Sequence, residues 1–177
     1  MAREVRQATT GDAEGIHKTA RASWHAAYDD VLGPETVDEI VDDWYALGDL
    51  ESSIADASRR DDAMFLVVDA DGEDAASAVL DRCRGFAHVV PWPEETSVAY
   101  LVRLYVDPDV WGEGTGTELL EFLENGLADR FDRIRLAVLA DNRVGVSFYD
   151  GTGFECVETR ESELANGLEE YVYEKPI

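Results

Sequence analysis

The sequence predicts an α+β fold built around one central mixed β-sheet. The order of apolar segments, the change in their periodicity and a glycine-rich turn between a strand and a helix lead to this prediction. Along the chain we expect a strand, helices, three strands, a helix, a strand, a helix and two strands. Elements in this order pack in layers around a shared core. The 177 residues suit one domain, which we take as residues 1–177.

The first third of the chain is mostly helical in pattern. Residues 2–8 predict a short strand, and apolar residues then recur at helical spacing from about residue 12 to residue 58. The dipeptide Gly33-Pro34 interrupts this pattern, because these two residues favour turns. The residues that show the helical spacing best are Ile16, Ala20, Trp24 and Tyr28.

Strands dominate the middle of the chain. Residues 63–70 are densely apolar and predict a strand that ends in a turn at Asp71-Gly72. Residues 73–84 are ambiguous between a loop and the start of a strand. Residues 85–90 predict a strand that Pro91 ends, since proline cannot donate to a strand ladder.

The last part of the chain alternates between strands and helices. A helix is expected at residues 115–129, because its leucines recur on one face and its glutamates on the other. A second, shorter helix is expected at residues 143–150. The accompanying strands are expected at residues 98–106, 134–139, 154–159 and 170–174.

The chain is strongly acidic, with 39 Asp and Glu against 15 Lys and Arg and a net charge of −24. The acids are spread along the chain, unlike those of a disordered acidic tail. Molar salt, with a Debye length of about 3 Å, screens the repulsion among such charges. We therefore predict a cytoplasmic protein of a halophilic archaeon; an acidic surface for a basic partner stays open as the alternative.

Composition also excludes several classes of protein. Nucleic-acid binding is not expected, because no basic patch is available to neutralise phosphates. No apolar run approaches the roughly 20 residues that span a membrane, and the N-terminus has no apolar leader region. Cys83 and Cys156 lie far apart and form no CxxC pair, so we expect two reduced thiols.

The strongest chemical signal is the segment from Leu104 to Leu120, in which a strand leads through three glycines into a helix. Glycines let backbone amides approach an anion, and the first turn of a helix has unpaired N–H groups. Together they predict a cradle for a pyrophosphate group. The segment has no P-loop lysine and lacks the dinucleotide-binding spacing. A turn that only connects strand to helix stays open as the alternative.

This segment resembles motif A of the GNAT acetyltransferases, which reads roughly Leu-Tyr-Val-x-Pro followed by Gln/Arg-x-x-Gly-x-Gly/Ala. Residues 141–154 are similar to the family's Asn…Phe-Tyr…Gly-Phe motif, and Trp24 and Tyr28 match one branch of the family. The likeness covers nearly the whole chain. It implies the GNAT (acyl-CoA N-acyltransferase) fold, whose central mixed, mostly antiparallel sheet is flanked by helices on both faces.

The resemblance implies transfer of an acetyl group from acetyl-CoA to a primary amine, by direct attack in a ternary complex that requires no metal and no enzyme nucleophile. A small amine, a polyamine, an antibiotic and a protein N-terminus all stay open as acceptors, and a homodimer is expected as a possible assembly. The alternative is a non-catalytic acyl-CoA-binding or sensing module, because basic and acidic residues common in the family are missing here.

The family pattern also implies the site. The strand before the glycine turn would diverge from its neighbour and pair with pantetheine, and the Val106 N–H would polarise the thioester. Tyr149 matches a tyrosine that protonates the departing thiolate; a packed aromatic is the alternative. The implied cofactor contacts are Leu104, Tyr105, Val106, Trp111, Gly112, Glu113, Gly114, Thr115, Gly116, Thr117, Asn142 and Phe148.

Some positions depart from the family pattern. Trp111 replaces the usual Arg or Gln, and Glu113 lies where a basic residue is common. Tyr100 occupies the place where many members have a Glu that relays the amine's proton. The general base therefore stays open among Glu94, Glu95, His88 and water. The acceptor pocket is expected to include Trp24, Tyr28 and His88, for which core packing is the alternative.

Overall fold

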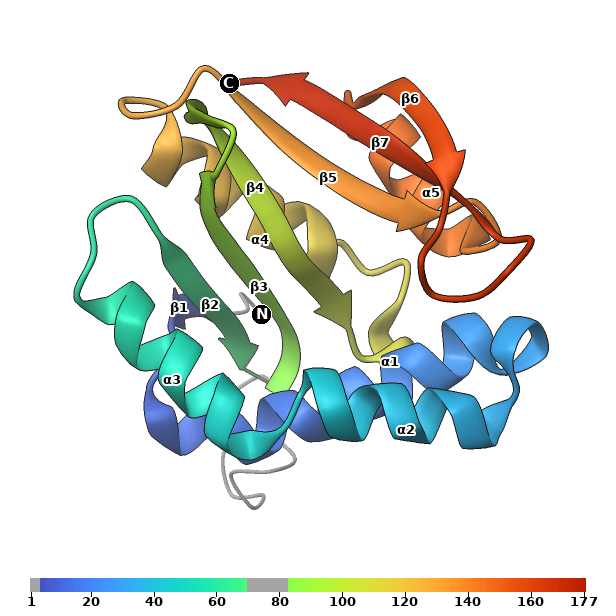
Figure 1. Cartoon of the computed structure of the whole chain (residues 1–177). Helices are drawn as coiled ribbons and strands as arrows, with labels where there is room; N and C mark the ends of the chain where they lie inside the picture. The colour runs from blue at the N-terminus through green and yellow to red at the C-terminus, as the bar shows by residue number, and fades with distance from the viewer. Residues whose placement is uncertain (1–3, 70–82) are drawn as a thin grey trace.

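Seven strands form one sheet within residues 4–69 and 83–177, which the computed structural model describes (Figure 1). The strands lie in the order β1-β2-β3-β4-β5-β7-β6. Neighbours pair antiparallel except β4 and β5, which are parallel, so the predicted mixed, mostly antiparallel sheet is confirmed. The strands are β1 (Glu4–Gln7), β2 (Met64–Asp69), β3 (Cys83–Trp92), β4 (Glu95–Val106), β5 (Arg133–Leu139), β6 (Glu155–Glu161) and β7 (Glu169–Pro176).

Helices cover both faces of the sheet, as the family resemblance implied (Figure 1). The first face carries α1, α2 and α3, and the second carries α4 and α5. Each group encloses its own apolar core against the strands. The helices are α1 (Ala13–Leu32), α2 (Pro34–Trp44), α3 (Leu47–Ser58), α4 (Thr115–Leu127) and α5 (Arg143–Gly151), with short 3-10 turns at η1 (Thr10–Asp12) and η4 (Pro108–Val110).

Local sequence explains where these helices begin and end. Gly33 has φ +87°, a conformation that glycine adopts easily, and it ends α1. Pro34 then opens α2, where its missing N–H costs nothing. The apolar stripe of α4 is fully buried, as its spacing predicted. No helix among the described residues is long and apolar enough to cross a membrane.

The pairing of β4 with β5 is short, and this positions the site. Only Val98–Tyr100 pair with Arg133–Arg135, and beyond them the two strands diverge. β4 also contains a bulge: His88 and Val89 pair with Arg103 and Leu101, so Val102 is the extra residue. A bulge bends its strand and redirects its side chains. The C-terminal half of β4, residues 101–106, therefore presents an unpaired backbone edge toward β5.

The prediction that Pro91 ends its strand was wrong. β3 continues to Trp92, and a tight turn leads into β4 at Glu95. Proline fits here because β2 pairs with β3 only as far as Val89, and the register shifts next to Pro91. At such an open edge no partner requires the missing N–H. The predicted turn at Asp71-Gly72 and most of the ambiguous stretch 73–84 lie outside the described residues.

Candidate active site

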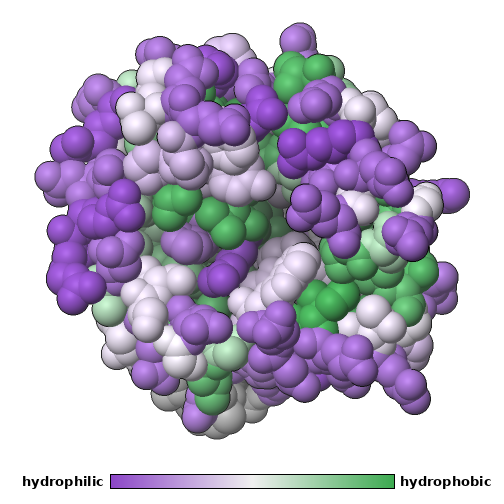
Figure 2. Space-filling model, in the orientation of Figure 1, coloured by the Kyte–Doolittle hydropathy of each residue, from purple (hydrophilic) through white to green (hydrophobic). Residues whose placement is uncertain are grey.

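A cleft of about 1640 Å³ opens where β4 and β5 diverge. Figure 2 shows it as a hollow near the centre of the face that α1–α3 partly cover. The cleft has two halves. The cofactor half is the part along the C-terminal half of β4, the glycine turn and the starts of α4 and α5. We call the part beneath α1, the α2–α3 connection and the segment between β6 and β7 the acceptor half.

The cleft brings together most of the residues that the family resemblance implied. Two of them do not line it, namely Glu113 and His88. The implied residues that do line it are Trp24, Tyr28, Leu104, Tyr105, Val106, Trp111, Gly112, Gly114, Thr115, Gly116, Thr117, Asn142, Phe148 and Tyr149. Residues separated by more than a hundred positions in the chain therefore share one cavity.

The edge of β4 supplies backbone groups to the cofactor half. The Asp107 N–H donates to the Arg84 carbonyl of β3 at 2.9 Å. Because successive residues of a strand point their backbone groups to opposite sides, the N–H groups of Val106 and Leu104 face the gap toward β5. The indole Nε1 of Trp111 donates to the Val106 carbonyl at 2.8 Å, which anchors the glycine turn to the end of the strand.

The glycine turn has the conformation that an anion cradle needs. Gly112 and Gly114 have φ +81° and +90°, which side chains rarely adopt. Gly114 is the N-cap of α4, and the first intrahelical bond runs from the Glu118 N–H to the Gly114 carbonyl at 3.0 Å. The amides before Glu118 therefore have no acceptor within the helix. The Thr115 hydroxyl is buried there, and no described residue forms a hydrogen bond with it. These donors fit the diphosphate of coenzyme A.

Asn142 connects the two halves of the cleft. Its side-chain oxygen caps α5 by accepting from the Gly145 N–H at 3.0 Å. Its amide nitrogen donates to the Tyr28 hydroxyl of α1 at 2.9 Å. The family motif implied a cofactor contact for Asn142; the structure gives it a positioning role as well, since it fixes the start of α5 relative to α1.

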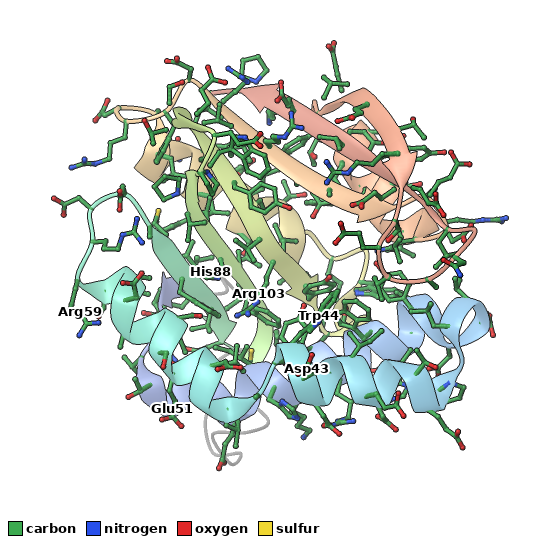
Figure 3. The ribbon with its side chains drawn as sticks, viewed as in Figure 1. Asp43, Trp44, Glu51, Arg59, His88 and Arg103 are labelled. Carbon is green, nitrogen blue, oxygen red and sulfur yellow. The ribbon has the colours of Figure 1, made fainter. Side chains whose placement is uncertain are left out.

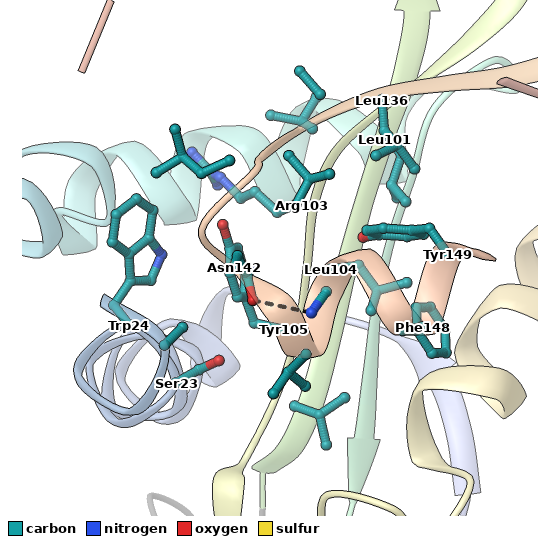
Figure 4. A pocket seen from close by; sticks show the side chains of 18 of the residues that line it. Ser23, Trp24, Leu101, Arg103, Leu104, Tyr105, Leu136, Asn142, Phe148 and Tyr149 are labelled. Carbon is teal, nitrogen blue, oxygen red and sulfur yellow. Dashed lines mark hydrogen bonds between the residues drawn. The ribbon is translucent and has the colours of Figure 1, made fainter. Parts of the chain in front are cut away.

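Tyr149 lies on α5 with only 7% of its surface exposed. Its ring packs edge-on against Phe148 and Phe154, with centroids 5.2 and 5.3 Å away. The hydroxyl points into the cleft, toward the side on which Leu104 lies (Figure 4). Burial, and then the neighbouring Tyr28, raise the pKa of Tyr149 above its ordinary value. The hydroxyl thus keeps its proton at neutral pH, as a proton donor must.

Aromatic side chains form the wall of the acceptor half. The Trp24 ring lies 4.6 Å from Tyr28 and 6.0 Å from Tyr105, measured between centroids. Trp24 Nε1 donates to the Tyr45 hydroxyl at 3.2 Å. Trp44 meets Trp24 edge-on at 5.7 Å and keeps nearly half of its surface exposed at the rim. Trp24 and Tyr28 were expected here. Tyr45 was not, because it follows the polar helix α2 and belongs to no recognisable motif.

Charged residues in the acceptor half were not foreseen from the sequence. Arg103 stacks over the Tyr45 ring at 5.1 Å and donates to the Trp44 carbonyl at 3.2 Å (Figure 3). Burial lowers the pKa of Arg103, and its buried Nη1 has no hydrogen-bond partner within residues 4–69 and 83–177. The sequence did contain one signal for this residue, because a single arginine interrupts the apolar run 101–106. The carboxylates that line the cleft are Asp43, Asp49, Glu161, Glu163 and Glu170.

The residues that the sequence suggested as general bases lie elsewhere. His88 is 8% exposed and stacks on Phe65 at 4.7 Å, on the far side of Arg103 from the cleft (Figure 3). Burial lowers its pKa to about 4. Glu95 pairs with Arg133 at 2.7 Å, and Glu94 lies in the β3–β4 turn. Among the described residues, no group of three or more His, Cys, Asp or Glu could hold a metal ion.

Comparison with known proteins agrees with this geometry. The profile of the acetyltransferase (GNAT) family matches residues 19–154. The chain belongs to the GNAT family. It is accordingly an acetyl-CoA-dependent N-acetyltransferase, and acetyl-CoA is its cosubstrate.

Similarity to known proteins covers nearly the whole chain. A spermidine N(1)-acetyltransferase of Thermoplasma acidophilum is 27% identical over 165 residues, which cover 93% of this chain and 95% of the relative. The crystal structure of PaiA N-acetyltransferase from the same organism, in complex with coenzyme A, superimposes with a TM-score of 0.82 at 25% identity and covers 100% of both chains. The ribosomal-protein-S18-alanine N-acetyltransferase of Escherichia coli shares the fold, with a TM-score of 0.70, 18% identity and coverage of 99% and 94%.

Proposed function

We propose that the protein acetylates a primary amine of a polyamine by direct attack on acetyl-CoA in a ternary complex, with residues 1–177 acting as one catalytic domain. One observation carries this proposal: a single cleft joins the amide-lined cofactor half to the aromatic and acidic acceptor half. A donor and an acceptor bound in the two halves meet in the gap between β4 and β5. Holding both reactants there supplies much of the rate enhancement.

The residues of the cofactor half supply the chemistry of the transfer. The Leu104 and Val106 N–H groups face the gap, where they would hold pantetheine and polarise the thioester carbonyl. As the amine nitrogen bonds to the carbonyl carbon, the carbon–sulfur bond breaks. Tyr149 gives its proton to the departing sulfur and regains one from the new amide nitrogen. The reaction thus forms an amide and free coenzyme A without a covalent enzyme intermediate.

The acceptor half supports a polycationic substrate. Five carboxylates line the cleft against two arginines, and one of these, Arg160, is already paired with Glu170 at 3.5 Å. Trp44, which is nearly half exposed at the rim, adds a ring face, and such faces attract ammonium groups. The Thermoplasma relative, which this chain matches over nearly its whole length, is a spermidine N(1)-acetyltransferase, and this supports the same class of acceptor.

A panel of amines tests the proposal. Purified protein would be incubated with acetyl-CoA in molar KCl with spermidine, spermine, single-charge alkylamines, an aminoglycoside and a peptide with a free N-terminus. Mass spectrometry would identify the products. We expect kcat/KM to be highest for the polyamines and much lower for single-charge amines. Preference for the peptide would contradict the polyamine assignment, and turnover of no amine would contradict the proposed transfer.

A further inference from the structure

The reaction needs a group that removes a proton from the acceptor, because an amine in water at neutral pH is mostly an ammonium ion and cannot attack. Tyr100 occupies the β4 position where the family often has a glutamate, and the side chains that the sequence suggested as bases, Glu94, Glu95 and His88, do not line the cleft. We propose that Glu170 of β7 binds the acceptor's reactive ammonium group and takes its proton. This inference rests on the proposed function.

Strand register places Glu170 one strand away from the reacting gap, next to Leu139 of β5. Glu170 pairs with Leu139 of β5, and Leu139 belongs to the core under α1–α3. Leu139 lies four residues beyond Arg135, and on the parallel strand Leu104 lies four residues beyond Tyr100, the partner of Arg135. Leu104 and Leu139 are therefore at about the same height on opposite banks of the gap, and Glu170 lies beside Leu139, one strand further from β4. The side chain of Glu170 lines the cleft from the face that the acceptor half occupies.

Burial distinguishes Glu170 from the other acids of the cleft. Its side chain is 18% exposed, whereas Asp43, Asp49, Glu161 and Glu163 are exposed to solvent. A carboxylate shielded from water attracts an ammonium group more strongly than one on the rim does. The nearby Glu174 is equally shielded, but it is bound by Arg133 and Arg135 at 3.1 and 2.8 Å and does not line the cleft.

The surroundings of Glu170 leave room for a second cation. Its one described ion pair, with Arg160, is long at 3.5 Å, and the Arg160 side chain is 42% exposed. Burial raises the pKa of Tyr100, and among its charged neighbours Glu170 raises it while Arg160 and Arg135 lower it. The other charges on this side of the cleft are Arg103 across the gap and the rim acids. Among the carboxylates that line the cleft, Glu170 is thus the one that is shielded from solvent.

The proton balance is complete without a further reagent. The ammonium group gives one proton to the Glu170 carboxylate, which leaves a neutral amine whose lone pair attacks the thioester carbon. A second proton of that nitrogen reaches the sulfur through Tyr149. Glu170 then releases its proton to water through the open rim of the cleft. One proton per turnover therefore enters the solvent, as the net reaction of an alkylammonium ion requires.

Three variants test this assignment. Glu170→Gln keeps the shape and removes the base. Glu169→Gln alters the adjacent exposed acid, which points to the other side of the strand and does not line the cleft. Arg160→Gln breaks the same ion pair but leaves the Glu170 carboxylate. The measurements are kcat/KM for spermidine between pH 6.5 and 10, and acetyl-CoA affinity by calorimetry.

We expect Glu170→Gln to lower kcat/KM for spermidine about 100-fold at pH 7, within the usual range for general-base catalysis. The deficit should shrink as the pH approaches the pKa of the amine, because free amine then needs no base. Acetyl-CoA affinity and the Glu169→Gln variant should match the wild type. Arg160→Gln should not lower kcat/KM, since it removes a positive charge next to a cationic acceptor.

Two results would overturn the assignment. If Glu170→Gln and Arg160→Gln lower kcat/KM equally and at every pH, the ion pair is structural. If Glu170→Gln acetylates spermidine like the wild type, the base lies elsewhere, although the proposed function still stands. A wild-type protein that acetylates no amine would instead refute the proposed function itself, so the two failures are distinguishable.

Discussion

The two halves of the cleft recognise their ligands by different means. In the cofactor half, the polar groups that face the cleft are mainly backbone amides of β4 and of the glycine turn, and side chains such as Trp111 hold that backbone in place. In the acceptor half, aromatic rings and carboxylates from several separate segments form the surface. A backbone amide is the same group in every sequence, whereas a side chain is not. The first half is therefore suited to a constant ligand and the second to a selected one.

This contrast explains how the cofactor half accommodates unusual residues. Trp111 replaces a residue that is commonly basic, yet its indole anchors the turn through the Val106 carbonyl. Glu113 adds negative charge, but its side chain does not line the cleft. The amides that would hold the diphosphate come from the first turn of α4, and their direction is set by the glycine conformations. We therefore expect side-chain differences such as Trp111 and Glu113 to alter affinity while the backbone cradle remains.

The largest expected effect lies where the two halves meet, at Tyr149. Tyr149→Phe keeps the packed ring and removes the proton that the departing sulfur needs. We expect kcat to fall about 100-fold, within the range of general-acid catalysis, with little change in the KM for acetyl-CoA. Steady-state kinetics over both substrates measures this. Unchanged kcat with a lower melting temperature would show that the hydroxyl is structural, and that water or the acceptor protonates coenzyme A.

The next effect concerns the cofactor half alone. Gly114→Val places a β-branched side chain at φ +90° in the anion cradle. We expect the affinity for coenzyme A to fall at least tenfold, about 1.4 kcal/mol, because the turn can no longer present its amides. Gly33→Val is the matched control: it introduces the same kind of strain at φ +87°, away from the cleft. Equal affinity losses in both calorimetric titrations would mean that strain, and not the cradle, is responsible.

Salt should affect the two halves in opposite directions. Between 0.1 and 1 M KCl the Debye length falls from about 10 to about 3 Å. Repulsion between the acidic protein and polyanionic acetyl-CoA weakens, so its KM should fall several-fold. Attraction between the acidic cleft and spermidine weakens as well, so the KM for spermidine should rise several-fold. If both constants move in the same direction, the acids of the acceptor half do not bind the substrate.

The smallest effect is on the fold itself. The net charge of −24 predicts self-repulsion that salt relieves. Below roughly 0.5 M KCl we expect stability to fall by about 1 kcal/mol, or about 3 °C in Tm. Melting curves at fixed pH between 0.1 and 3 M KCl test this prediction of halophily. A flat profile would favour the alternative that the acids serve a basic partner.

Much of the fold was predictable because local patterns set it. The leucine stripe of α4, the break at Gly33-Pro34 and the dense apolar strand β2 all lie where periodicity placed them. The error at Pro91 arose because a proline is tolerated when the neighbouring strand has already ended, and the sequence does not show which strands are neighbours. The bulge at Val102 was also unpredicted, since it depends on register between two strands.

The sequence determined the family, the fold class and the residues of the cofactor half, because these depend on contiguous motifs in which a few glycines and one strand set the backbone. The tertiary structure decided the acceptor half. Tyr45, Arg103 and Glu170 belong to no shared motif, and they become one surface only when the α2–α3 connection, β4 and β7 meet around the gap. Likewise, only the register of β5 with β7 places Glu170 next to Leu139, on the face of the sheet that the acceptor half occupies. Side chains brought together from distant segments by sheet pairing leave no local trace in the sequence.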